Sequence, residues 1–135
     1  MHDTKICVVV RDDLETWQKL NVTAFLSAGV AASASDSIGE KYEDGSGNFY
    51  LPIFTQPVFI FAASTEHLQR TRARALSRGV PMALYTKHMF ATSNDDDNRA
   101  VVKAVAADSL DVVGLAFRAE RKTFDKIVSG PKLRP

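Results

Sequence analysis

The residues that could do chemistry in this sequence follow the apolar segments predicted to be buried strands. In an open α/β sheet, ligands bind beyond the carboxyl ends of the strands. That rule nominates residues behind three of the segments: Arg11, Asp12, Asp13, Ser64, Thr65, Lys87 and His88. Acidic, basic and amine side chains in one crevice can do acid–base work, and the same side chains can form an ordinary salt-bridged rim. Both alternatives stay open from the sequence.

Two polar residues, Asn21 and Thr23, interrupt an apolar helix predicted over residues 15–34. Buried polar groups need hydrogen-bond partners, and local hydrogen bonding can supply them. The alternative is that Asn21 faces a polar pocket at the end of the sheet. Asn21 is therefore a candidate ligand-binding residue.

Basic side chains form a stripe on the next predicted helix, which follows Ser64 and ends at Arg78. His67, Arg70, Arg74 and Arg78 recur at near-helical spacing and so share one face. A solvated face is the usual role of such a stripe. The alternative is contact with RNA phosphates, which makes affinity fall steeply with salt.

The sequence favours no metal site, no cofactor and no cysteine chemistry. Its histidines are scattered, and its one cysteine, Cys7, lies in a run of valines that is typical of a core position. The run Asp95-Asp96-Asp97 lacks the glycine and distal glutamate of a calcium loop, so we interpret it as a helix cap. Known phosphate-loop, dinucleotide, zinc-protease and serine-hydrolase motifs are absent.

Length and composition predict a single domain over residues 1–135. Hydrophobic residues make up 45% and charged residues 24%, which is the usual globular balance. No apolar run approaches the ~18 residues of a membrane span, and the first residues lack the basic start and apolar stretch of a signal peptide. These features predict a soluble, cytoplasmic protein with no membrane partner.

The formal net charge of +1 conceals an asymmetry. Residues 1–66 carry four Lys/Arg and nine Asp/Glu, a balance of −5, whereas residues 67–135 carry 13 and seven, a balance of +6. The basic half can attract polyanions, or it can pair with the acidic half within one domain. The second interpretation is the commoner one.

Apolar runs and cap residues predict alternating strands and helices. The expected strands are 5–10, 57–63, 82–86 and 111–117; the expected helices are 15–34, 65–78, one after the Ser93–Asp97 cap, and 119–129. This order implies an α/β fold with helices on the sheet faces. The first helix is apolar nearly all round, which predicts that it is buried on every side and that Trp17 lies in the core. Residues 35–48 predict a loop and residues 49–54 an extended segment.

The residues Val9-Val10-Arg11-Asp12-Asp13-Leu14, with the small-residue-rich helix behind them, resemble the opening of type-II peptidyl-tRNA hydrolases. Further similarity lies in the segment from Glu66 to Pro81, in Val113-Gly114, and in Asp125-Lys126-Ile127 with Lys132-Leu133. The resemblance covers most of the chain and is closer still to uncharacterised bacterial proteins thought to share that fold. It implies a three-layer α/β sandwich with a four-stranded mixed sheet, a possible homodimer, and tRNA as a possible partner.

The departures from the family's pattern fall on its catalytic positions. Its catalytic lysine aligns with Leu20, its aspartate with Lys87 and its threonine with Ala91. Leucine and alanine cannot donate, accept or bear charge, and losing one stabilising group typically costs about 10²–10³ in rate. We therefore expect a non-hydrolase relative that uses the same crevice to bind a small metabolite or a nucleotide-bearing partner.

Two other functions remain open. One is an altered hydrolase that uses Asp13, Lys19, Lys87 and His88, since Lys19 is one residue from the aligned lysine position. The other is an RNA-binding module that uses the basic stripe. The candidate ligand-binding residues are thus Arg11, Asp13, Lys19, Asn21, Lys87 and His88, and the RNA-binding candidates are Arg70, Arg74 and Arg78.

Overall fold

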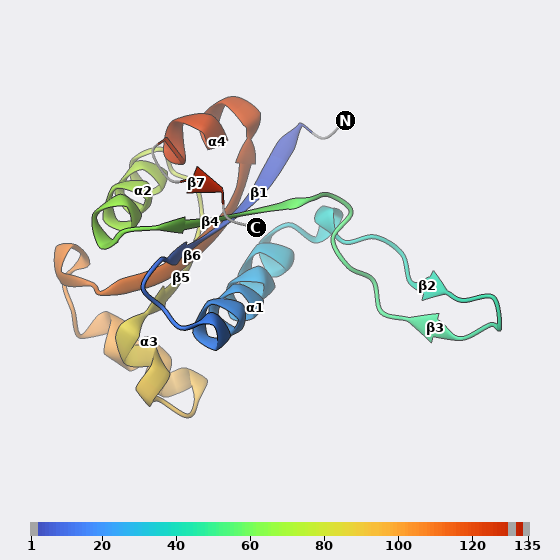
Figure 1. Cartoon of the computed structure of the whole chain (residues 1–135), viewed down its shortest axis with the longest axis horizontal. Coiled ribbons are helices and arrows are strands. Elements are labelled where there is room, and N and C mark those ends of the chain that lie inside the picture. The colour runs from blue at the N-terminus through green and yellow to red at the C-terminus, as the bar shows by residue number, and fades with distance from the viewer. Residues whose placement is uncertain (1–2, 130–131, 134–135) are drawn as a thin grey trace.

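A mixed β-sheet forms the centre of the protein. The computed structural model describes residues 3–129 and 132–133. The strands lie in the order β5-β6-β1-β4-β7, and β1 and β4 form the parallel pair (Figure 1). Their bounds are β1 Thr4–Arg11, β4 Val58–Ala63, β5 Ala83–Thr86, β6 Val112–Glu120 and β7 Lys132–Leu133. The four predicted strands are confirmed as a mixed sheet, and the two-residue β7 adds an edge strand that was not predicted.

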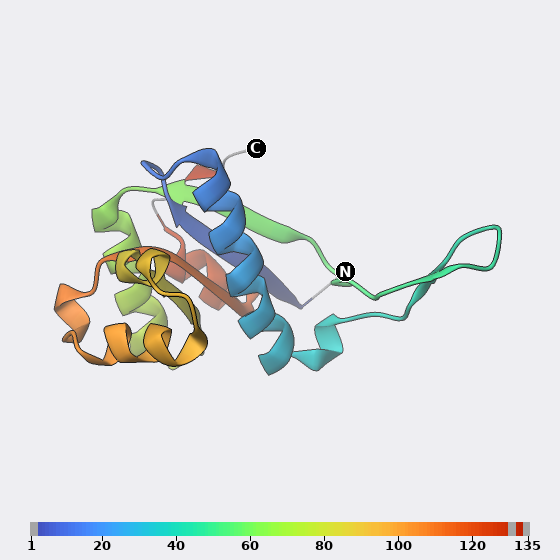
Figure 2. The same ribbon diagram turned by 90° about the horizontal axis from the view of Figure 1, so that it is seen from below.

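Helices cover both faces of this sheet. Helix α1 (Thr16–Ser33) lies on one face, and α2 (Thr65–Ser77) and α4 (Arg121–Ile127) lie on the other (Figures 1 and 2). Alternate side chains of β1 point to opposite faces, so Val8 packs with the α1 side and Val9 with the α2 and α4 side. Helix α3 (Asp95–Lys103) follows the short helix η2 (Lys87–Ala91), and η3 (Ala107–Ser109) leads into β6.

Close packing joins α1 to β6 at Gly114. A Cβ placed on Gly114 would lie 2.6 Å from Val22 Cγ1 and 3.1 Å from Leu26 Cδ1. Val22 and Leu26 are both buried. Only glycine at position 114 therefore lets the helix approach the strand this closely. This contact fixes how α1 lies over the carboxyl end of β1.

Two sequence predictions about helices are wrong. The last helix begins at Arg121 rather than residue 119, because β6 continues to Glu120, which pairs with Thr4. Helix α1 is not buried on every side, and Trp17 is not a core residue. Trp17, Leu20 and Phe25 are each more than half exposed, because α1 uses Val22, Leu26 and Val30 to contact the sheet.

A hairpin arm leaves the body between α1 and β4. After η1 (Ser35–Ser37), β2 (Tyr42–Glu43) and β3 (Phe49–Tyr50) pair antiparallel, and Ile38 bridges Phe54 at the base. We call residues 38–54 the arm. It reaches away from the body in both views (Figures 1 and 2). The sequence predicted only a loop and an extended segment here.

Ion pairs join the acidic and basic halves of the chain. Arg11 Nη1 lies 2.6 Å from Asp111 Oδ1, Arg118 Nη1 lies 3.1 Å from Asp36 Oδ2, and Lys5 Nζ lies 3.8 Å from Asp125 Oδ1. Each pair crosses from one half to the other, but only Arg118–Asp36 joins a base of the basic half to an acid of the acidic half. Pairing between the excess charges of the two halves therefore stays a prediction.

Candidate functional site

A cavity of about 590 Å³ opens where β1 and β4 end beside the start of α1. This volume lies within the ~300–1,000 Å³ range of small-molecule sites. Ligands in α/β sheets bind at the carboxyl ends of the strands, and this cavity lies at that end of the parallel pair, alongside the last residues of β1 and β4. Polar and apolar residues line it together: Val10, Asp12, Thr16, Lys19, Leu20, Thr23, Ile60, Phe61 and Ala62. We call it the α1 cavity.

Local structure places the polar residues of the α1 cavity. Asp12 follows β1, and its backbone N–H donates to Ala63 O at 2.9 Å, which continues the parallel ladder for one residue. Glu15 then starts α1 with a capping box, in which Gln18 Oε1 accepts from the Glu15 backbone N–H at 3.0 Å. Thr16, Lys19 and Thr23 recur at i, i+3 and i+7, so they share one side of the helix.

The chemistry of the α1 cavity is an apolar floor with a charged and hydroxyl rim. Lys19 offers an ammonium with three donors, and Asp12 a carboxylate that accepts. The Thr23 hydroxyl donates to Lys19 O at 2.7 Å, which leaves its oxygen lone pairs as acceptors. The arrangement can therefore hold a ligand with an apolar body, an anionic group and a hydrogen-bond donor.

Arg11 and Asp13 lie at the same strand end but bind each other. Arg11 Nε donates to Asp13 Oδ1 at 2.6 Å, and its Nη1 donates to Asp111 Oδ1 at 2.6 Å. Burial lowers the pKa of Arg11, but the hydrogen bonds and charges of Asp13 and Asp111 outweigh it and raise that pKa. Arg11 is a fixed cation that ties β1 to the residue before β6.

The other predicted ligand-binding residues lie apart from the α1 cavity. Lys87 and His88 are exposed on η2, and the half-buried Asn21 lies on α1. None of these three residues lines the α1 cavity. Of the six candidates, Lys19 alone lines the α1 cavity, and the roles proposed for the others stay predictions.

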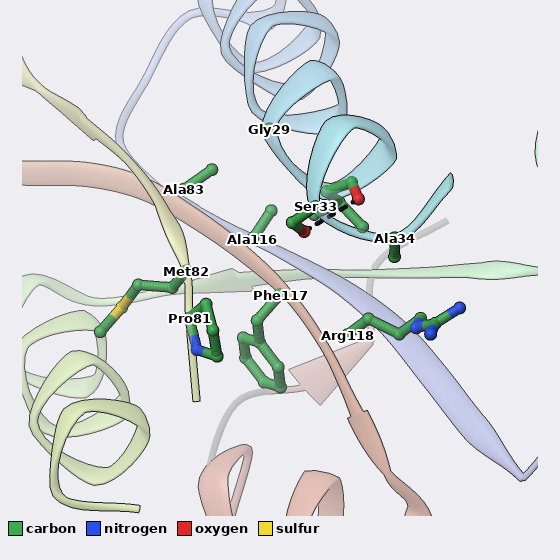
Figure 3. A pocket seen from close by; sticks show the side chains of 10 residues that line it. Gly29, Ser33, Ala34, Pro81, Met82, Ala83, Ala116, Phe117 and Arg118 are labelled. Atoms are coloured by element: carbon green, nitrogen blue, oxygen red, sulfur yellow. Dashed lines mark hydrogen bonds between the residues drawn. The ribbon is translucent and has the colours of Figure 1, made fainter. Parts of the chain in front are cut away.

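A second cavity, of about 300 Å³, lies between the end of α1 and the strands β5 and β6. Ser33 there donates to Val30 O at 3.1 Å, and Arg118 turns away from Ala83 and Ala116 to pair with Asp36 (Figure 3). Its polar side chains are thus already engaged within the chain. This second cavity therefore offers a ligand fewer free polar groups than the α1 cavity does.

A third cavity, of about 590 Å³, lies between α1, β5 and the start of α3. Asn94, as the N-cap of α3, accepts from the Asp97 backbone N–H at 2.8 Å, and Asp95 pairs with Arg99. Burial raises the pKa of the Tyr85 hydroxyl in its wall. The N-cap of α3 is thus Asn94, and the run Asp95–Asp97, which the sequence analysis interpreted as the cap, forms the first turn of the helix, where Asp95 and Asp96 pair with Arg99.

The arginines of the basic stripe on α2 differ in their surroundings. Arg74 Nη1 donates to Ser129 O at 2.7 Å and so holds the end of α4. Arg70 and Arg78 are exposed. An RNA contact at these three residues stays a prediction.

Neither cysteine chemistry nor a metal gains support. Cys7 is fully buried, as predicted for a core residue, and burial raises the pKa of its thiol. Within residues 3–129 and 132–133, no three His, Cys, Asp or Glu side chains gather as metal ligands do. In that same part of the chain, no helix is both long and apolar enough to cross a membrane.

Residues 4–135 match the sequence profile of a family described as a protein of unknown function, DUF2000. The chain belongs to the DUF2000 family. This membership agrees with the expected group of uncharacterised proteins. Comparison with the curated proteins gives no match.

A solved structure shares the whole fold with this DUF2000 chain. It is that of a protein of unknown function from Agrobacterium tumefaciens strain C58, 48% identical in sequence. The similarity covers 100% of both chains with a TM-score of 0.98. At this identity, coverage and TM-score the two chains share one fold.

Proposed function

We propose that the protein binds a small molecule in the α1 cavity and is not a peptidyl-tRNA hydrolase. The observation that carries this proposal is the cavity itself. It lies alongside the carboxyl-terminal parts of the parallel strands β1 and β4, and it combines an apolar floor with Asp12, Thr16, Lys19 and Thr23. An apolar pocket with a few convergent polar groups is the usual form of a small-molecule site.

The lining favours a metabolite with an apolar body and at least one carboxylate or phosphate. The Lys19 ammonium would take the anionic group, and Asp12 would accept from an amine or hydroxyl of the ligand. Val10, Ile60 and Leu20 would cover the apolar part. The volume accommodates a small ligand and not a folded macromolecule.

The proposal includes the type-II peptidyl-tRNA hydrolase-like fold. Support comes from the mixed sheet, from helices on both faces, and from the strand-end position of the cavity. Leu20, which aligns with that family's catalytic lysine, lines the cavity with an apolar side chain. Lys87, which aligns with its aspartate, lies outside the cavity on η2.

An altered hydrolase is the second candidate, because one observation favours it. Asp12 and Lys19 line the same cavity, so a carboxylate and an amine border one space in which a water could be activated. This pair differs from the predicted set, which placed Asp13, Lys87 and His88 beside Lys19. Ester cleavage by the wild-type protein that Lys19→Met abolishes would favour this candidate over simple binding.

Thermal unfolding with a panel of small anionic metabolites tests the binding proposal. A ligand at 100 times its Kd adds about 2.7 kcal/mol, which raises Tm by roughly 10 °C in a domain of this size. Lys19→Met should weaken the binding of that ligand by about 10–100-fold, since hydrogen bonds to charged groups contribute ~1.5–3 kcal/mol.

Lys122→Met is the matched control, because Lys122 is exposed on α4, on the other face of the sheet. It should bind the ligand as the wild type does. Equal affinity in Lys19→Met and wild type, or a panel in which no compound raises Tm, would contradict the proposal.

A further inference from the structure

The arm carries an apolar surface that the body does not cover. Five of its large side chains are between 53% and 80% exposed: Tyr42, Phe49, Tyr50, Leu51 and Ile53. An isolated two-stranded hairpin is at best marginally stable in water. An arm of this composition that reaches away from its own body is therefore suited to contact another surface.

Internal hydrogen bonds nevertheless order the tip of the arm before it contacts any partner. The Asp44 carboxylate accepts from the backbone N–H groups of Ser46 at 2.9 Å and Asn48 at 3.0 Å, and from the Tyr50 hydroxyl at 2.8 Å. Gly47 adopts φ +84°, a conformation that favours glycine. Order in the unbound arm lowers the entropy that docking must overcome.

The outward side of α1 is a second apolar surface. Trp17, Leu20 and Phe25 are 58–68% exposed there. Surface helices normally turn charged side chains to solvent, yet Lys19 is the only charged residue among the 18 of α1. The exposed side chains of Ala24 and Ala28 add small residues between the large ones, which leaves room for an incoming segment.

We propose that the arm of one copy docks on the α1 surface of a second copy, and the reverse, in a two-fold homodimer. Each chain carries both surfaces, so a two-fold axis would cover both at once and close the assembly. Lys19 lies on the cavity side of α1 with Thr16 and Thr23, so the outward surface of the helix carries no charged side chain and the proposed contact is apolar.

The exposed apolar area agrees with a stable dimer. A half-exposed large side chain offers roughly 100 Å², so the eight such residues of the arm and α1 present about 800 Å² per chain. A standard protein–protein interface buries ~800 Å² per partner.

Sedimentation and fluorescence of the full chain test this assembly. Trp17 is the only tryptophan, so its emission reports directly on the α1 surface. The wild type should sediment as a dimer at micromolar concentration, and its emission should shift to the blue as dimers form. Leu51→Ser should weaken the dimer about tenfold or more, since burying a leucine contributes ~1.5–3 kcal/mol.

Leu76→Ser is the matched control, because Leu76 is also exposed but lies on α2, on the opposite face of the sheet. It should dimerise as the wild type does. A monomer at all concentrations, or a dimer whose Trp17 emission stays that of an exposed indole, would overturn the proposal. So would a dimer as tight in Leu51→Ser as in the wild type. Far-UV circular dichroism verifies that each variant is folded.

Discussion

At the scale of single residues, Arg11 is a fixed cation at the strand end beside the α1 cavity. Its side chain is only 11% exposed and is held by Asp13 and Asp111. Asp111→Asn would remove one countercharge from this largely buried cation. We expect a loss of about 1–2 kcal/mol in the free energy of unfolding, measured by urea denaturation.

Asp125→Asn provides the comparison for that loss. Asp125 pairs with Lys5 at 3.8 Å and is 68% exposed, so its removal should cost less than about 0.5 kcal/mol. Equal losses in the two variants would show that burial of Arg11 does not govern the energetics of this network.

Asp44 gives a prediction about pH. The Asn48 backbone N–H, the Tyr50 hydroxyl, the Asn48 side chain and the Ser46 N–H hold the pKa of its carboxyl far below the ordinary value. The pKa is depressed in the folded arm, so its stabilisation is present above the ordinary aspartate pKa of ~3.9 and is lost only as pH falls through the folded value. We expect the Asp44 carboxyl to stay ionised at about pH 3 by NMR titration.

Tyr50→Phe checks the cause of that shift. Removing the phenol hydrogen bond should raise the pKa of Asp44 toward its ordinary value. In the wild type the same bond raises the pKa of Tyr50, because it stabilises the protonated phenol. An Asp44 that titrates as an ordinary aspartate in the wild type would contradict the hydrogen-bonded tip.

At the scale of elements, the contact of α1 with β6 at Gly114 depends on the absence of a side chain. Gly114→Ala would place a methyl 2.6 Å from Val22 Cγ1, and overpacking of this kind typically costs about 1–3 kcal/mol. We expect that loss in chemical denaturation, together with weaker ligand binding, since α1 supplies Thr16, Lys19 and Thr23 to the cavity.

Gly45→Ala is the matched control, because nothing lies within 4 Å of the added methyl and Gly45 does not adopt a positive φ. It should change the free energy of unfolding by no more than a few tenths of a kcal/mol. A neutral Gly114→Ala would mean that α1 can move away from β6 without cost.

The sequence predicts the sheet well because its strands are continuous apolar runs such as Ile6–Val10. It fails on α1, since an apolar outer side gives the same pattern whether or not the chain itself covers it. The arm is missed because β2 and β3 have two residues each, too few for an alternating pattern. In the candidate site, the position of Asp12 directly after a predicted strand identifies it from the sequence. The helical spacing of Thr16, Lys19 and Thr23 could also have indicated that these polar residues share one side of α1. Only the structure shows that they surround a cavity with Ile60.

At the scale of the whole molecule, the body should be stable without the arm. No side chain between residues 40 and 53 is buried, and Thr55 N–H donates to Ser37 O at 2.8 Å across the base of the arm. Replacing residues 40–52 by a two-residue Asn-Gly turn should therefore leave a folded body.

If the arm docks on a second copy, the Tm of the wild type should rise with protein concentration, because association stabilises only the folded state. The shortened chain should lose that dependence and retain its Tm, matching the wild type at high dilution. Calorimetry of both proteins over a concentration series measures this, and a shortened chain that does not fold, or a wild-type Tm that is independent of concentration, would contradict it.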